Sequence, residues 1–161
     1  MIAAADYLAK QDYIDPDRIY LGGHSTGGTL VLLCAAASDQ FRAVFAFGPV
    51  DEVIRYGDAA LPFNVKDPKE LELRNPVNWL NSIKSPTFAI EGENGNAYSL
   101  QMMQIANTNP LVKCYVVEQT DHFRILGPIN ELLAKKVYED TEEHCNITIT
   151  PKELREAMST Q

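Results

Sequence analysis

The sequence predicts an α/β protein with a mainly parallel sheet of about four strands and helices on both faces. Short apolar runs alternate along the chain with segments of helical spacing, which is typical of repeated βαβ units joined by right-handed crossovers. The run Ala43-Val44-Phe45-Ala46-Phe47 is apolar throughout, as expected of a strand covered by helices on both faces. A length of 161 residues suits one domain with a substantial core.

The first half of the chain predicts two helices and two strands. Apolar residues within residues 1–10 have helical spacing. Asp15-Pro16-Asp17 is typical of a turn and precedes a predicted strand over 18–21. A second helix contains the apolar segment 30–37, and the buried strand over 43–47 follows it.

The second half continues the alternation after an irregular excursion over 51–74, which contains several prolines and scattered charges. Asn75 is a suitable N-cap for a short helix, with Pro76 in its first turn. The remaining predicted elements are a helix over 77–83, a strand over 86–91, a helix over 98–107, a strand over 112–118 and a helix over 127–138.

A C-terminal extension over 141–161 differs in character from residues 1–140. Thr150, Pro151 and Glu153 form the pattern of a capping box, with proline at the first helical position. We therefore expect a short helix over 151–158.

The most informative motif is Gly23-His24-Ser25-Thr26-Gly27, which lies between a predicted strand and a predicted helix. This order is what a nucleophile elbow requires, because the serine must stand on a tight, strained turn that exposes its hydroxyl. Small residues two before and two after the serine allow the strand and helix to pass close together. The helix N-terminus then directs N–H groups at the space where an oxyanion would form.

A serine nucleophile needs a base, and His122 is the best placed of the three histidines. It follows the last predicted strand, so its loop opens at the same carboxyl edge of the sheet as the elbow. His24 neighbours the serine and is expected to form a wall of the substrate pocket. His144 lies in a polar segment and is expected at the surface.

Composition excludes several other classes of function. The formal net charge is −8, without a cluster of basic residues, which disfavours nucleic-acid binding. The longest uncharged apolar run is too short to span a membrane. The three cysteines have no metal-ligand spacing, so we expect no metal and no cofactor. Their number and the absence of a signal-peptide pattern favour a cytoplasmic location.

Together these motifs resemble the α/β-hydrolase superfamily, and within it the prolyl-oligopeptidase and dienelactone-hydrolase-like branch. The similarity extends over about residues 2–138. It depends on the elbow, on Asn75-Pro76 leading through 83–87 into the following strand, and on Asp121-His122-Phe123. It implies a truncated α/β-hydrolase fold. It also implies that Ser25 is the nucleophile, that His122 is the general base and that the Thr26 backbone N–H is one oxyanion donor.

The sequence departs from that family at the acid that orients the histidine. The position that best matches the family's aspartate is Gly95, which has no side chain. Asn96 is our first expectation for a substitute, with Asn94, Glu93 and Asp51 as alternatives. An amide fixes the tautomer of an imidazole but stabilises its positive charge less well than a carboxylate does.

A second departure concerns the sheet edge. The chain begins just before the elbow strand, so a strand that is central in the family is expected at an edge. We expect either a homodimer or a missing N-terminal half to cover it.

Two functions follow from these expectations. The first is a serine hydrolase that cleaves an ester or peptide-like acyl bond, in a small-molecule or peptide substrate, through a Ser25 acyl-enzyme. The alternative is a catalytically impaired relative that acts as a binding or assembly module. An acyltransferase would use the same elbow, and the sequence does not separate it from a hydrolase.

Overall fold

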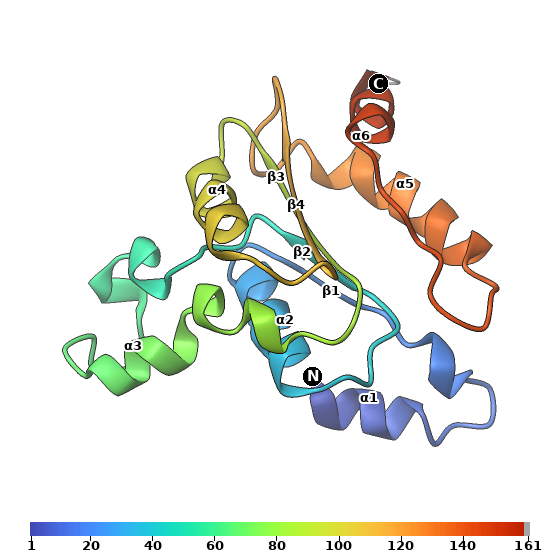
Figure 1. Ribbon diagram of the computed structural model, residues 1–161, viewed down its shortest axis with the longest axis horizontal. Coiled ribbons are helices and arrows are strands. Elements are labelled where there is room, and N and C mark those ends of the chain that lie inside the picture. Colours follow the sequence, from blue (N-terminus) through green and yellow to red (C-terminus); the bar gives the residue numbers. More distant parts are fainter. Residues whose placement is uncertain (160–161) are drawn as a thin grey trace.

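The structure, a computed structural model that describes residues 1–159, contains a four-stranded parallel sheet in the order β1-β2-β3-β4 (Figure 1). The strands are β1 (Leu21–His24), β2 (Val44–Phe47), β3 (Thr87–Gly92) and β4 (Val112–Val117). All pairings are parallel, so every carboxyl end lies at one edge of the sheet. The predicted fold class is confirmed.

Helices cover both faces of this sheet (Figure 1). The α-helices are α1 (Ile2–Leu8), α2 (Thr26–Ala37), α3 (Pro68–Arg74), α4 (Ala97–Ala106), α5 (Leu126–Glu139) and α6 (Pro151–Ser159). Single 3₁₀ turns cover Pro16–Arg18, Val53–Tyr56, Asp58–Ala60, Pro76–Asn78 and Leu80–Ser82. Helices α2 and α4 pack on one face, and α5 and α6 on the other. None of the helices in the described part of the chain has the length and apolar character needed to cross a membrane.

The strand β2 shows why an unbroken apolar run suits this position. Val44 and Ala46 face the core beneath α2 and α4, whereas Phe45 and Phe47 face the core beneath α5. Successive strand side chains point to opposite faces, so a strand with two buried faces favours apolar residues at every position. Both cores are therefore encoded in the same short segment.

The strand β1 lies at one edge of the sheet, as expected. It pairs only with β2 among the described residues, and Gly22 in its middle is exposed. Its outer backbone groups are therefore available to another strand.

The C-terminal extension shares the core of the rest of the chain. Ile147, Ile149 and Leu154 are buried against side chains from the sheet and α5. The predicted capping box is confirmed, because Thr150 Oγ1 accepts from the Glu153 N–H at 3.2 Å and Glu153 Oε2 accepts from the Thr150 N–H at 2.8 Å. The extension therefore closes one face of the sheet.

A buried carboxylate, Asp140, fastens the start of this extension to the sheet. Arg42 donates to both carboxylate oxygens, at 2.6 and 2.9 Å. The Tyr20 hydroxyl donates at 2.7 Å and the Asn146 N–H at 3.0 Å. The hydrogen bonds from Arg42 hold the pKa of Asp140 well below its usual range, whereas burial raises the pKa of Tyr20 to about 12. One ionised side chain thus joins three separate segments.

Two predicted elements differ from the structure. The strand expected over 18–21 begins at Leu21, because the Asp15 side chain accepts from the Asp17 N–H and stabilises a 3₁₀ turn first. The helix expected over 77–83 is instead a pair of 3₁₀ turns. Asn75 does not cap it, because Asn75 Oδ1 accepts a hydrogen bond from the Val53 N–H at 2.9 Å. A tertiary contact replaces the expected local one.

Candidate active site

Ser25 occupies the sharp turn that its motif predicts. It lies between the last residue of β1 and the first residue of α2, with φ +57° and ψ −120°. Its N–H donates to the Phe47 carbonyl at 2.8 Å, which continues the sheet pairing to the end of β2. Positive φ is rare for a residue with a side chain and is characteristic of a nucleophile elbow.

The glycines around Ser25 differ in what they allow. A Cβ on Gly23 would lie 2.4 Å from the Gly27 carbonyl oxygen, and one on Gly28 would lie 2.4 Å from the Phe47 carbonyl oxygen. A Cβ on Gly27 would have open space, with nothing within 4 Å. The close passage of strand and helix therefore requires glycine at 23 and 28, and Gly27 leaves the surface above the turn open.

This difference gives a paired stability prediction. Gly23→Ala should lower the free energy of unfolding by about 2 kcal/mol, because overpacking against backbone atoms forces the elbow to shift. Gly27→Ala should be neutral or should stabilise by about 0.5–1 kcal/mol, because alanine favours the helix. Urea denaturation of both variants measures the difference. Equal tolerance at the two positions would contradict the packing described here.

The start of α2 offers free N–H groups beside Ser25. The first helical hydrogen bond runs from the Thr29 N–H to the Ser25 carbonyl, at 3.0 Å. The N–H groups of Thr26, Gly27 and Gly28 precede that bond, so they have no partner within the helix. The Thr26 N–H, which directly follows Ser25, is the first of these groups.

His122 lies in the turn after β4. Because all the strands are parallel, this turn is at the same edge of the sheet as Ser25, which follows β1. The Asp121 side chain shapes that turn by accepting from the N–H groups of Phe123 and Arg124, both at 2.9 Å. His24 Nε2 donates to the His122 carbonyl at 3.0 Å, and the two imidazole rings are 4.3 Å apart between centroids. His24 therefore holds the turn that carries His122, and its expected place in a substrate pocket stays a prediction.

The His122 ring contacts a residue that sequence reasoning missed. Glu91, near the end of β3, places Oε2 2.6 Å from His122 Nδ1. Its side chain is fully buried, whereas that of His122 is 18% exposed. The Glu91 carboxylate also accepts from the backbone N–H groups of Gly92 at 2.6 Å and Asn96 at 2.9 Å. A carboxylate acceptor at Nδ1 assigns the ring proton to that nitrogen and leaves Nε2 as the proton acceptor.

None of the four acids or amides expected to orient His122 contacts its ring among the described residues. The Asn96 side chain instead donates to the Gly48 carbonyl at 2.9 Å, and its N–H supports Glu91. Asp51 pairs with Arg55. Glu93 accepts from the Gln119 N–H at 3.1 Å, and Asn94 bonds only through its backbone, to the Thr120 carbonyl. The contact that we expected from Asn96 is therefore corrected to one from Glu91.

A signal for Glu91 was present in the sequence. It is the only charged residue in the strand β3, directly after the apolar run Phe88-Ala89-Ile90. A carboxylate in a strand that is buried on both faces needs a specific partner. The sequence thus indicates a buried carboxylate at the carboxyl edge of the sheet. It does not indicate that the Glu91 side chain turns toward His122.

The Ser25 hydroxyl itself has no hydrogen-bond partner among the described residues, and His122 Nδ1 is directed to Glu91. Gly48, which follows β2, connects the two regions. Its neighbour Phe47 binds the Ser25 N–H, and a Cβ on Gly48 would lie 2.3 Å from His122 Cε1. The segment Phe47–Gly48 therefore lies against both the Ser25 backbone and the His122 ring.

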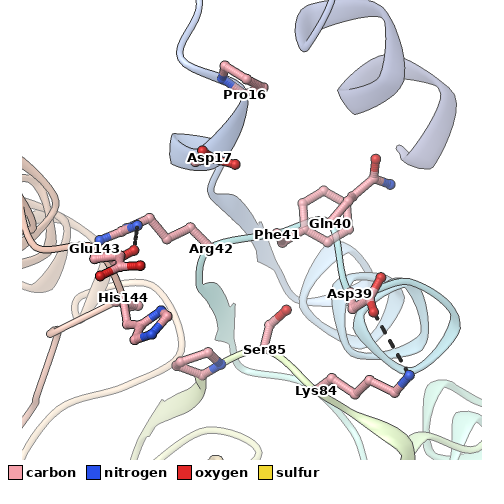
Figure 2. A pocket seen from close by; sticks show the side chains of 12 residues that line it. Pro16, Asp17, Asp39, Gln40, Phe41, Arg42, Lys84, Ser85, Glu143 and His144 are labelled. Carbon is pink, nitrogen blue, oxygen red and sulfur yellow. Dashed lines mark hydrogen bonds and ion pairs between the residues drawn. The ribbon is translucent and has the colours of Figure 1, made fainter.

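A hollow of about 580 Å³ lies at the other edge of the sheet, by the amino ends of the strands (Figure 2). His144 lines it, together with Arg42 and Lys84. Figure 2 shows Lys84 directed toward Asp39, and Arg42 is already bound to Asp140. Arg42 and Lys84 are thus already paired, and the length of the strands separates this hollow from Ser25.

Comparison with known proteins identifies the family to which this chain belongs. The model of the prolyl oligopeptidase family matches residues 1–108, and the chain belongs to that family. The matched part contains Ser25 and Glu91 and ends before His122. No curated protein matches the chain.

Solved structures of hydrolases have the same fold. Acylaminoacyl peptidase from Pyrococcus horikoshii matches with a TM-score of 0.67 at 16% identity, over 94% of this chain and 28% of that one. Dipeptidyl peptidase 4 from Porphyromonas gingivalis matches with a TM-score of 0.66 at 17% identity, over 86% of this chain and 21% of that one. Acetyl xylan esterase from Paenibacillus sp. R4 matches with a TM-score of 0.65 at 16% identity, over 86% of this chain and 50% of that one. The chain therefore spans half or less of the length of these proteins.

Proposed function

We propose that this protein is a serine hydrolase that cleaves an ester or peptide-like acyl bond, with Ser25 as nucleophile and His122 as general base. The observation that carries the proposal is the positive φ of Ser25 at a strand-to-helix turn, on the sheet edge where His122 also lies. Backbone strain of this kind persists only where the surrounding structure enforces it, and it is often found at active sites. The prolyl oligopeptidase family membership supports the same chemistry.

The first half of the proposed reaction forms an acyl-enzyme. His122 Nε2 takes the proton from Ser25 Oγ as that oxygen attacks the carbonyl carbon of the substrate. The carbonyl oxygen becomes an oxyanion and accepts a hydrogen bond from the Thr26 N–H. When the intermediate collapses, the bond to the leaving group breaks, and the leaving group takes the proton from His122.

The second half releases the acyl group. A water molecule gives its proton to His122 Nε2 and attacks the acyl carbon. The bond to Ser25 Oγ then breaks, the serine recovers its proton from the imidazolium, and a carboxylic acid leaves. His24, which holds the His122 turn through the backbone, keeps the base over the acyl carbon in both halves.

Covalent labelling tests this proposal. A fluorophosphonate reacts with activated serine hydroxyls, so the protein should gain one adduct, and peptide mass spectrometry should locate it on Ser25. The Ser25→Ala variant, which keeps the elbow backbone, should gain none. A folded protein that stays unlabelled, or that carries its adduct on another serine, would refute the assignment.

The binding-module alternative had two reasons, the lack of a carboxylate at position 95 and the expected loss of the second oxyanion donor, and the structure bears on the first. The pairing of Glu91 with His122 removes that reason and favours the enzyme. The partners proposed are an acyl substrate at Ser25 and a strand, from a second copy or from further sequence, at the free edge of β1. The three cysteines are free thiols in the structure, which is compatible with the cytoplasmic location that we propose.

A further inference from the structure

The Glu91 carboxylate and the His122 ring meet in a narrow slot between two glycines. On one side, a Cβ on Gly95 would lie 2.6 Å from Glu91 Cδ, 2.7 Å from Oε1 and 2.8 Å from Oε2. On the other side, a Cβ on Gly48 would lie 2.5 Å from His122 Nδ1 and 2.7 Å from Glu91 Oε2. Real Cβ atoms do not approach other atoms this closely. The pair therefore fits only because neither position has a side chain.

We propose that Glu91 is the carboxylate that orients His122 and stabilises its imidazolium, and that Gly95 is the position that makes room for it. The inference rests on the proposed function, because it assigns the third member of the same catalytic group. Glu91 acts through His122 and does not touch substrate, so it is a positioning residue. It reaches the ring from within β3, whereas an acid at position 95 would reach it from the loop after that strand.

The hydrogen bonds of Glu91 fit this role. The Gly92 N–H binds Oε1 and the Asn96 N–H binds Oε2, so the backbone fixes the plane of the carboxylate. Oε2 then accepts the proton on His122 Nδ1 at 2.6 Å, a short distance, and hydrogen bonds to an ionised acceptor are shorter than neutral ones. The side chain is fully buried, so water does not compete for this contact.

The slot has room for one carboxylate. A side chain at position 95 would overlap the Glu91 carboxylate at its first carbon, so an acid at 95 would force that carboxylate out of its present position. The effects of substitutions at positions 91 and 95 on the labelling rate should therefore not be additive. Gly95→Asp should be harmful while Glu91 is present, and it should be beneficial once Glu91 has been shortened to alanine.

The first test compares rates of labelling of Ser25 by a fluorophosphonate. Glu91→Gln, nearly equal in shape, should slow labelling by about 10²–10⁴-fold, because an amide neither fixes the same tautomer nor stabilises the imidazolium. The same substitution in a His122→Gln background should change the rate less than threefold, because Glu91 acts only through His122. Circular dichroism and urea denaturation establish that each variant is folded.

The second test exchanges the carboxylate between positions. Gly95→Asp alone should slow labelling at least tenfold, and Glu91→Ala with Gly95→Asp should react at least tenfold faster than Glu91→Ala. In the unchanged protein, proton NMR should show a far-downfield Nδ1–H resonance that disappears in His122→Gln and Glu91→Gln. That spectrum reports on the pairing without any reaction at Ser25.

The outcomes separate the two proposals. If the unchanged protein is folded but Ser25 is not labelled, the proposed function fails. If Ser25 is labelled, a folded Glu91→Gln variant that reacts as fast as the unchanged protein would overturn the role proposed for Glu91. An equal loss from Glu91→Gln with and without His122 would also overturn it, because the effect would then be structural.

Discussion

Replacing His122 by glutamine should slow the reaction of Ser25 with a fluorophosphonate by about 10²–10⁴-fold, the usual contribution of a general base. The glutamine amide keeps a polar group beside the buried Glu91 carboxylate, so the turn should remain folded. It takes up no proton, so Ser25 must react as an unassisted hydroxyl. Stopped-time labelling, with mass spectrometry of the Ser25 peptide, measures the rate.

His144→Gln is the matched control. His144 is exposed and lies by the amino ends of the strands, at the other edge of the sheet. The same change in chemistry there should leave the labelling rate unaltered. Similar losses in the two variants, or no loss at His122, would show that the histidine after β4 does not serve Ser25.

Asp140→Asn should lower the free energy of unfolding by about 3 kcal/mol. Arg42 would lose its ionised partner while its own side chain stays only 8% exposed, and removal of one partner from a buried pair leaves an uncompensated charge. The Tyr20 hydroxyl loses its strongest acceptor in the same step. Urea denaturation followed by circular dichroism measures the loss.

The same carboxylate predicts a pH dependence. The pKa of Asp140 is lowered by its hydrogen bonds from Arg42, so its contribution to stability is present above the pKa of an unfolded aspartate. That contribution is lost as the pH falls below about 4. The unfolding free energies of the unchanged protein and Asp140→Asn should therefore converge in acid. Asp39→Asn is the control, because Asp39 Oδ2 lies 3.9 Å from Lys84 Nζ in an exposed ion pair. This change should lower the free energy of unfolding by less than about 1 kcal/mol at any pH. A larger loss would contradict the contrast between the two sites.

Much of the fold was predictable because its strands have a strong and local signal. The run 43–47 and the run 88–90 are apolar on both faces, which occurs where helices cover both faces of a parallel sheet. The helix expected over 77–83 failed for a reason outside its own sequence. Its cap, Asn75, binds the backbone of Val53 in another segment, and pattern analysis has no access to that contact.

The site shows the same division between local and tertiary information. Ser25 and Thr26 could be predicted because they lie in one contiguous motif. The positive φ at Ser25 is the backbone strain that this motif predicts. The acid was missed because we expected it in the loop after β3, where Asn96 lies. Glu91 lies inside the strand, and only the empty volume at Gly95 lets its carboxylate turn toward His122. Sequence gives the residue types, and side-chain direction decides which of them meet.

A crystal structure of the protein after reaction with a fluorophosphonate tests most directly whether Ser25 and His122 form one catalytic pair. The phosphorus should be bonded to Ser25 Oγ, with a phosphonyl oxygen accepting from the Thr26 N–H. His122 Nε2 should lie within hydrogen-bond distance of Ser25 Oγ. An adduct on another residue, or a His122 ring turned away from a phosphonylated Ser25, would contradict the account.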